Sequence, residues 1–497
     1  MSGKVPIRKL SSGVPGLDDV LGGGFPELSF NLVVGAPGCG KTTLGHQIMF
    51  ANASRERKAL YFMILGEPPI KMLRYQQQFS FFDLAKVEDS IRFVHLAEDA
   101  KKGGLAQVLA RIEREVDETG PALVFVDSFR SMIQRALVEQ GDGDLPMQDF
   151  IQRLAVHLTN CEATTFLLGE YADNEHDGDV FTVADGILRL YQDVDRNSVV
   201  RKLHVMKMRG QGQIPGLHTT RITDAGVSVF PRLLDPQQRL VTGPLEHRLS
   251  TGIPVLDEMM RGGIPAGYSV LIAGPSGSGK TVLSNQFLIE GARRGEKGVV
   301  AVFEKRPEDY LSTTPHGKEF ERLIQAGQLE VLYLRPLDLS IDETLVALRA
   351  AVMRTGATRA VIDSLSGLEL ALAPTFREDF RESTYRMMGA LIGCGVTVMA
   401  TVELNDSYVD LQLSPQGVAF LTDAIVIQRY VEREGRLTRA LAVVKLRSSP
   451  HSSDLRAYEI SEDGLMIMGN EIHGYEGLLS GAPSKIEKPR AQPREEK

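Results

Sequence analysis

The sequence predicts an α/β protein with two tandem domains of the same kind, each a mainly parallel sheet with helices on both faces. Two observations predict this fold. A glycine-rich segment occurs twice, as GAPGCGKT at residues 35–42 and as GPSGSGKT at residues 274–281. In both halves of the chain, apolar segments of strand length alternate with helical patterns, which is typical of parallel sheets that helices cover on both sides.

The repeat extends beyond the glycine-rich segments. Aligning Lys41 with Lys280 sets an offset of 239 residues, and this offset aligns residues 10–26 with 249–265 without a gap. Chance similarity of two short loops would not extend this far. The sequence therefore indicates gene duplication and fusion, which gives two homologous domains.

The individual elements follow from the apolar pattern. Strands 28–35 and 268–274 are predicted to enter the glycine-rich segments, and helices 42–54 and 281–294 to leave them. The remaining predicted strands are 59–65, 122–128 and 164–170 in the first half and 298–304, 359–364 and 396–403 in the second.

The length of 497 residues exceeds what one hydrophobic core usually organises. We expect a first domain over residues 1–232 and a second over 247–468. Prolines and polar residues predict a linker at 233–246, and the Pro-, Lys-, Glu- and Arg-rich end predicts a disordered tail at 469–497.

Composition excludes several classes of protein. The chain is 43% hydrophobic and 24% charged, and no apolar run approaches the roughly 20 residues of a membrane span. The first ten residues lack the apolar core of a signal peptide, so we expect a cytoplasmic protein without a membrane partner. A net charge of −8 disfavours nucleic acid as a partner. The three cysteines have no C-x-x-C spacing, so neither disulfides nor a zinc site are predicted.

Each glycine-rich segment lies between a predicted strand and a predicted helix, which is the context of a phosphate-binding loop. Its glycines let backbone N–H groups converge on phosphate oxygens at a helix N-terminus. Lys41 and Lys280 are expected to contact the β and γ phosphates of ATP, and the hydroxyls of Thr42 and Thr281 to bind Mg²⁺. The predicted nucleotide-binding residues are Gly35, Ala36, Pro37, Gly38, Cys39, Gly40, Lys41 and Thr42, and Gly274, Pro275, Ser276, Gly277, Ser278, Gly279, Lys280 and Thr281.

Carboxylates follow the neighbouring predicted strands. Asp127 and Asp363 end apolar strands and are predicted Mg²⁺ ligands, although an Asp in this position can also cap a turn. Glu67 and Glu304 lie 26 and 24 residues after the loop lysines and are the candidate groups that orient or deprotonate water; a surface acid is the alternative.

A cationic pair recurs late in each half. Lys207 and Arg209, and likewise Lys445 and Arg447, are two residues apart on predicted strands, so each pair projects on one face. We expect each pair to meet the γ phosphate held by an adjacent protomer, with a solvated edge strand as the alternative.

Residues 173–179 have the appearance of a calcium loop, but its twelfth position is Ala184 where a bidentate Glu is needed. We interpret this segment as an acidic surface loop.

With these motifs together, the chain resembles the KaiC family of tandem RecA-like P-loop ATPases over all but its tail. The resemblance rests on both glycine-rich loops and on the segments 11–24, 250–263, 361–367, 207–210 and 475–481. It implies a homohexamer of two rings with ATP and Mg²⁺ between protomers, ATP hydrolysis, and signalling or regulatory protein partners. Members of the circadian clock also phosphorylate themselves on a Ser-Thr pair in the second domain.

The sequence departs from that family pattern in two places. Of the paired glutamates only Glu67 remains in the first domain, and in the second Glu304 is followed by Lys305. Ala419 and Phe420 stand at the family's phosphate-acceptor positions, and neither carries a hydroxyl.

Four functions are compatible with these residues. The leading hypothesis is a hexameric regulatory ATPase. The alternatives are a serine/threonine autokinase that uses another acceptor such as Thr422, a nucleotide-gated scaffold without turnover, and a recombinase or helicase, which the acidic net charge disfavours.

Overall fold

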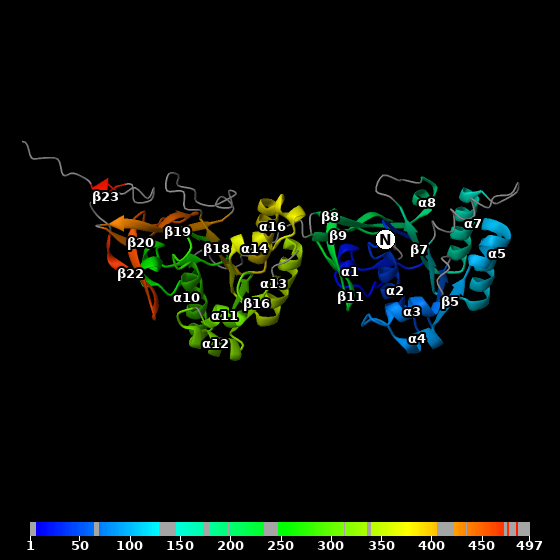
Figure 1. The fold of residues 1–497 in the computed structure, drawn as a ribbon, viewed down its shortest axis with the longest axis horizontal. Helices are drawn as coiled ribbons and strands as arrows, with labels where there is room; N and C mark the ends of the chain where they lie inside the picture. The colour runs from blue at the N-terminus through cyan, green and yellow to red at the C-terminus, as the bar shows by residue number, and fades with distance from the viewer. Residues whose placement is uncertain are drawn as a thin grey trace, which may run out of the picture. The chain divides into compact units, whose positions relative to one another are not determined.

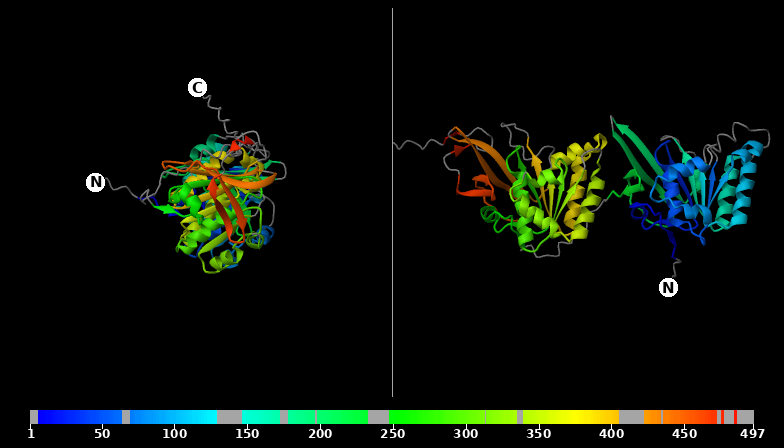
Figure 2. Two further views of the ribbon diagram at one scale, coloured as in Figure 1. Left: turned by 90° about the vertical axis from the view of Figure 1, so that its left-hand side faces the viewer. Right: turned by 60° about the horizontal axis from the view of Figure 1, so that its bottom comes forward.

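The computed structural model describes residues 6–63, 69–128, 146–171, 178–195, 198–232, 247–312, 314–334, 339–404, 422–433, 435–471, 475–476 and 484–485. The chain divides into two compact units, residues 1–233 and 234–497. Each unit is a sheet flanked by helices, as the views in Figures 1 and 2 show.

The first unit is built on a nine-stranded sheet in the order β11-β10-β9-β8-β3-β7-β6-β4-β5. The strands from β8 to β5 are parallel, and β9, β10 and β11 continue the sheet as antiparallel neighbours. The strands of this sheet are β3 Phe30–Gly35, β4 Ala59–Met63, β5 Ile91–His95, β6 Leu123–Asp127, β7 Thr164–Glu170, β8 Gly186–Asp195, β9 Ser198–Met208, β10 Leu217–Thr223 and β11 Gly226–Phe230. A separate two-stranded sheet joins β1 Lys9–Leu10 to β2 Phe25–Pro26.

Helices cover both faces of this sheet. One apolar cluster packs α5 and α7 against it, and a second cluster packs α1 and α2 against it from the other face. The central strands are buried on both sides, which explains their continuous apolar sequences. The helices are α1 Leu17–Val20, α2 Lys41–Asn52, α3 Pro69–Gln76, α4 Leu84–Asp89, α5 Ala97–Thr119, α7 Met147–Asn160 and α8 Gly178–Val183.

The second unit repeats this architecture. Its nine-stranded sheet has the order β16-β15-β17-β18-β14-β19-β20-β21-β22, which matches the first sheet strand for strand. The strands are β14 Ser269–Gly274, β15 Gly298–Val302, β16 Leu329–Tyr333, β17 Arg359–Asp363, β18 Thr397–Glu403, β19 Ala424–Arg433, β20 Arg436–Leu446, β21 Arg456–Ser461 and β22 Gly464–Glu471, with β12 Arg248–Leu249 and β13 Ile264–Pro265 as a separate pair. The helices are α9 Pro254–Met259, α10 Lys280–Arg293, α11 Pro307–Ser312, α12 Gly317–Gln325, α13 Ile341–Thr355, α14 Leu365–Ala371, α15 Pro374–Arg377 and α16 Phe380–Gly393.

These two sheets confirm the predicted fold class of tandem α/β domains with mainly parallel strands. The offset of 239 residues holds at the glycine-rich loops, where β3 and β14 end at Gly35 and Gly274 and the following helices begin at Lys41 and Lys280. Among the described residues, no helix is both long and apolar enough to cross a bilayer.

The C-terminal region differs from the expectation. Strand β22 runs to Glu471, beyond the expected domain end at residue 468, because it pairs with β21. Two short strands, β23 Tyr475–Glu476 and β24 Ser484–Lys485, pair with each other inside the segment expected to be disordered.

Candidate functional site

Both glycine-rich segments form a tight loop between a strand and a helix. Gly40 and Gly279 occupy the N-cap positions of α2 and α10 in left-handed conformations, with φ of 103° and 100°. A Cβ on Gly40 would lie 2.6 Å from Ile222, and one on Gly279 would lie 2.5 Å from Ile460. The positive φ favours glycine at this position in each loop, and a Cβ there would in addition have to displace the end of an isoleucine side chain.

The loop lysines make the same contacts in both units. The Nζ atom of Lys41 donates hydrogen bonds to the carbonyl oxygens of Gly35 and Ala36, each at 2.9 Å. Lys280 contacts the first two residues of its own loop in the same way, at 2.9 and 2.8 Å. Both ammonium groups thus lie within the loop, at the N-terminus of the following helix, where an anion is favoured.

The predicted magnesium ligands lie together in both units. The hydroxyl of Thr42 donates to Asp127 Oδ2 at 2.7 Å, and the hydroxyl of Thr281 donates to Asp363 Oδ2 at 2.8 Å. Each pair combines the start of the loop helix with the end of a parallel strand, β6 or β17. A hydroxyl and a carboxylate in contact at this edge are oxygen ligands of the kind that Mg²⁺ takes.

Each aspartate also accepts a hydrogen bond from a second hydroxyl, and the two units supply it from different strands. In the first unit Tyr61 on β4 donates to Asp127 Oδ2 at 2.7 Å. In the second unit Thr401 on β18 donates to Asp363 Oδ1 at 2.5 Å. Sequence analysis missed both residues, because a hydroxyl inside an apolar strand becomes meaningful only once the strand order is known.

Burial dominates the electrostatics of Asp127. Desolvation raises the pKa of this carboxyl, while the hydrogen bonds from Thr42 and Tyr61 and the charge of Lys41 oppose that rise. Burial next to Asp127 also raises the pKa of the Tyr61 hydroxyl well above its ordinary value, so this hydroxyl remains a donor.

A pocket of about 370 Å³ opens beside the first loop. Glu170, the last residue of β7, lines it and lies in register with Gly35. The candidate base Glu67 lies outside the described residues. The pocket is lined by Gly38, Gly40, Lys41, Thr42, Thr43, Tyr61, Met63, Met72, Asp127, Ser128, Glu170 and Ile222.

Carboxylates surround the second loop lysine. Burial lowers the pKa of Lys280, and the charges of Glu403, Asp363 and Glu304 oppose that shift. The candidate base Glu304 accepts a hydrogen bond from the Ser364 hydroxyl at 3.2 Å, next to the predicted metal ligand. The structure therefore brings Glu304 to the loop.

Glu170 and Glu403 are site residues that sequence analysis missed. Glu403 ends β18 in register with Gly274, as Glu170 ends β7 in register with Gly35. The sequence shows that both predicted strands end in glutamate, but only the strand order places each glutamate beside the first glycine of a loop.

The cationic pairs do not join the loop of their own unit. Lys207 pairs in register with Ile187, which is level with Leu32, three residues before Gly35 on β3. Lys207 therefore lies about 10 Å along the strand direction from the loop, on a strand that β8 separates from β3. Its Nζ atom donates to two carbonyl groups at the end of α8, both at 3.2 Å. Lys445 has the equivalent position and donates to the carbonyl of Thr422 at 2.5 Å.

The arginines of these pairs are not within the strands, which corrects the expectation. Strands β9 and β20 end one residue before Arg209 and Arg447. Each arginine turns back to an aspartate of its own unit: Arg209 to Asp185 at 3.2 Å and Arg447 to Asp423 at 3.4 Å.

The alternative phosphate acceptor Thr422 is fully buried. Ala419 and Phe420 lie outside the described residues, as do residues 173–177 of the acidic segment.

The sequence of this chain is similar to those of known proteins. A sequence model of the family described as "ATPase: KaiC" matches this chain twice, at residues 10–233 and 249–472. The chain is similar to circadian clock oscillator proteins KaiC from Picosynechococcus sp., with 26% identity over 97% of this chain and 93% of that protein, and from Acaryochloris marina, with 26% identity over 97% and 92%. The KaiC of Prochlorococcus marinus is 26% identical over 98% of this chain and 97% of its own length.

Two matched family domains, two phosphate-binding loops with the same internal contacts, and similarity along almost the whole chain lead to one conclusion: the chain belongs to the KaiC family and carries two P-loop ATPase domains of the KaiC type.

Proposed function

We propose that this protein is a Mg²⁺-dependent ATPase that works as a homohexamer, binds ATP between protomers in both domains and acts in signalling or regulation. The observation that carries the proposal is the pair of half-complete sites. Each unit holds a loop lysine, a hydroxyl and a carboxylate together, while the lysine of its Lys-Arg pair lies three residues in register before the loop, about 10 Å along the sheet.

The residues at each loop fit a magnesium triphosphate. The start of the loop helix offers backbone N–H groups, and the Thr-Asp contacts of 2.7 and 2.8 Å offer two oxygen ligands for the metal. When bound, Mg²⁺ neutralises charge on the phosphate oxygens. Glu67 and Glu304 are the groups that we assign to orient or deprotonate water in their respective domains.

The position of the cationic pairs supports assembly. Lys207 lies about 10 Å along the sheet from its own loop, and Lys207 and Arg209 contact α8 and Asp185 instead, which supports a role for the pair at the site of another protomer. A cation supplied by a neighbour to the γ phosphate stabilises charge that develops during transfer. This reasoning assigns the same role to Lys445 and Arg447 in the second domain.

The mass of the protein in solution tests assembly. With ATP and Mg²⁺ the wild-type chain should be a hexamer, and Lys41→Ala combined with Lys280→Ala should give smaller species at micromolar protein. A variant with two exposed lysines replaced, Lys101→Ala and Lys318→Ala, is the matched control and should remain hexameric. A hexamer of the loop variant without nucleotide would contradict nucleotide-dependent assembly.

A mixing experiment tests whether the pairs act on a neighbouring protomer. All proteins in it carry Glu304→Gln, which slows turnover in the second domain but leaves Lys280 in place to bind ATP and hold the hexamer. The variant Lys41→Ala has a defective loop and an intact Lys-Arg pair. The variant with both Lys207→Ala and Arg209→Ala has an intact loop and a defective pair. Each alone should release little phosphate, and the mixture should recover activity at protomer interfaces that combine an intact loop with an intact pair. A mixture no more active than its components would show that the pairs do not act between protomers.

The autokinase alternative has less support. Thr422 is fully buried, so its hydroxyl is not presented to a nucleotide in another protomer. Incubation with γ-labelled ATP should leave no label on residues 416–430, and label on Thr422 would favour the kinase.

A further inference from the structure

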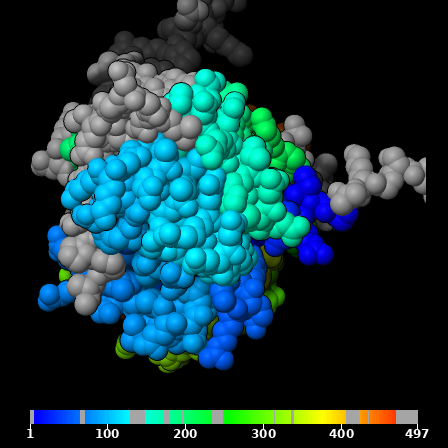
Figure 3. All heavy atoms as spheres, turned by 90° about the vertical axis from the view of Figure 1, so that its right-hand side faces the viewer, coloured from blue at the N-terminus to red at the C-terminus, as the bar shows by residue number. Residues whose placement is uncertain are grey.

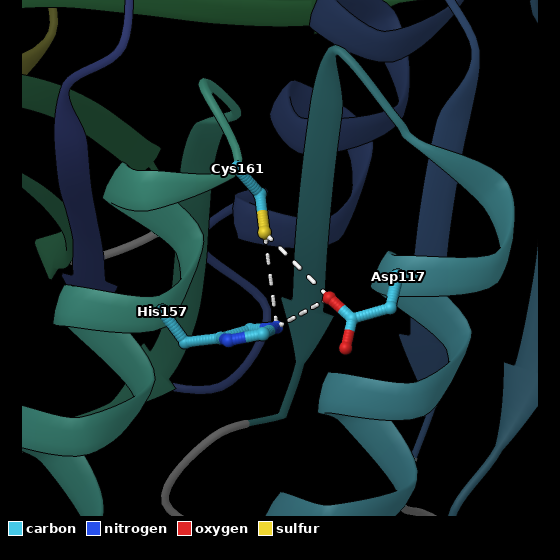
Figure 4. Close-up of side chains that lie close together, drawn as sticks. All are labelled: Asp117, His157 and Cys161. Atoms are coloured by element: carbon cyan, nitrogen blue, oxygen red, sulfur yellow. Dashed lines mark hydrogen bonds and ion pairs between the residues drawn. The ribbon is translucent and has the colours of Figure 1, made fainter.

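Three side chains of different chemistry meet between two helices of the first unit, away from the phosphate-binding loop. Asp117 lies near the end of α5, and His157 and Cys161 lie at the end of α7. Figure 3 views the first unit from the side of these two helices, which lie next to each other. In Figure 4 the three side chains point toward one another. The three residues are a carboxylate, an imidazole and a thiol, all of which are ligands of zinc.

The distances among the three side chains match those of a metal site. His157 Nε2 lies 3.2 Å from Asp117 Oδ1, and Cys161 Sγ lies 3.8 Å from both of these atoms. Tetrahedral zinc, with bonds of about 2.0 Å to nitrogen and oxygen and about 2.3 Å to sulfur, separates N from O by roughly 3.3 Å and S from either by roughly 3.5 Å. The side chains are therefore within about 0.3 Å of the required spacing before any metal binds.

We propose that Asp117, His157 and Cys161 form a zinc-binding site that joins the end of α5 to the end of α7. A thiol with an imidazole and one carboxylate favours zinc over Mg²⁺ or Ca²⁺, which prefer sites made of oxygen ligands alone. The side chain of Asp117 is 62% exposed and that of His157 is 23% exposed, so water has access to the fourth position. Binding replaces the thiol proton of Cys161 with a sulfur–zinc bond and releases that proton to solvent.

The carboxylate in the cluster supports a cation at this place. Asp117 Oδ1 lies within 3.8 Å of both the Cys161 sulfur and the His157 imidazole, so a dication between the three groups would lie next to a negative charge and would stabilise the thiolate.

The second unit supplies an internal comparison. Cys394 caps α16 as Cys161 caps α7, and in both cases the cysteine N–H donates to the carbonyl four residues earlier. That earlier residue is His157 in the first unit and Ala390 in the second. The partner helix α13 has Met353 three residues before its C-cap glycine, where α5 has Asp117. The second unit has therefore kept the cysteine without the other two ligands.

This comparison also explains why the sequence analysis predicted no zinc site. That prediction considered spacing between cysteines alone. The ligands here are a histidine four residues before a cysteine on one helix and an aspartate on another helix, which only the packing of α5 against α7 brings together.

Zinc titration of the full chain tests the proposal. The protein is first treated with a chelator and kept free of nucleotide, and free zinc is then followed with a competing chromophoric chelator. The wild type should bind one zinc per chain at micromolar concentration, and Cys161→Ser, His157→Ala and Asp117→Asn should each weaken binding at least tenfold. Cys394→Ser is the matched control and should bind as the wild type does. Equal binding by Cys161→Ser and the wild type, or no binding by the wild type, would overturn the proposal.

A second measurement locates the metal without any substitution. Cys161 and Cys394 are both partly exposed, so both should react with an alkylating reagent in the metal-free chain. Zinc should slow alkylation of Cys161 at least tenfold and leave Cys394 unaffected, as peptide mass spectrometry can measure. Equal protection of both cysteines, or protection of neither, would contradict a site at Asp117, His157 and Cys161.

Discussion

Tyr61→Phe tests whether a second hydroxyl is needed to hold the metal-binding carboxylate of the first domain. The substitution removes one oxygen atom that donates to Asp127 Oδ2 at 2.7 Å. The ring remains, and with it the contacts of Tyr61 to Phe125, Phe93 and His46. The change therefore isolates a single hydrogen bond.

The expected magnitude follows from burial and charge. Tyr61 is fully buried, and the acceptor is a carboxyl whose pKa burial already raises. A hydrogen bond to a charged group contributes about 1.5–3 kcal/mol, and 1.4 kcal/mol corresponds to about a factor of ten in affinity. This estimate agrees with the loss of about 10- to 100-fold in metal affinity that follows the removal of a group that orients a metal ligand. We expect Tyr61→Phe to weaken Mg²⁺ binding to the ATP complex of the first domain at least tenfold.

The assay needs a chain in which only the first domain binds the nucleotide, so that the signal reports Mg²⁺ binding to that domain alone. Lys280→Ala disables the second loop, and Mg²⁺ is titrated in the presence of a fluorescent ATP analogue. Tyr75→Phe is the control, since Tyr75 is 59% exposed and belongs to α3. In a parallel background with Lys41→Ala, Thr401→Val should produce the equivalent loss at the second loop.

A Tyr61→Phe protein with Mg²⁺ affinity within twofold of its parent would refute the reasoning. In that case the hydroxyl of Thr42 alone would be sufficient to hold Asp127 in place.

Three further predictions concern hydrolysis, packing and pH. Glu304→Gln should lower ATP turnover of the second domain by about 10²-fold while preserving nucleotide binding, as phosphate release in a Lys41→Ala background would measure. Glu296→Ala should destabilise the second unit by about 3–5 kcal/mol in chemical denaturation, because Arg359 is fully buried and Glu296, 2.5 Å away, is its carboxylate partner; unchanged stability would contradict this. His46 is buried and its pKa is lowered to about 4, so its contribution to stability is present above its ordinary pKa of 6.5 and is lost as the pH falls toward 4. The first unit should lose about 3 kcal/mol over this range, and His46→Phe should remove that dependence in denaturation measured at several pH values.

The strands next to the phosphate-binding loops could be predicted because they are buried on both faces. Strands such as β3 and β14 are continuous apolar sequences, and the glycines after them define their ends. The edge strands β5 and β16 were not predicted. Each contains a charged residue, Arg92 or Glu330, and is only partly buried, so its pattern resembles that of a loop.

The ligand pairs at the loops could be predicted from sequence because both members belong to recognisable segments. Thr42 follows the loop lysine and Asp127 ends an apolar strand, so each was found separately. Tyr61 and Thr401 could not be found this way, since their role depends on which strand lies beside β6 or β17. Pairing across a parallel sheet is set by crossovers, which the local sequence does not reveal.

Tyr61 and Thr401, the different hydroxyl donors of the two units, also bear on the order in which substitutions can exchange one donor for the other. Tyr61 corresponds in register to Val300, and Thr401 corresponds to Leu168, so conversion of one arrangement into the other takes two substitutions. The two hydroxyls contact different carboxylate oxygens, Oδ2 in one unit and Oδ1 in the other, and do not compete for one acceptor. A descendant chain can therefore gain the new donor before it loses the old one. In that order of substitutions, the buried aspartate always accepts a hydrogen bond from a second hydroxyl. Two copies of one ancestral domain can therefore diverge while each keeps its metal-binding carboxylate in place.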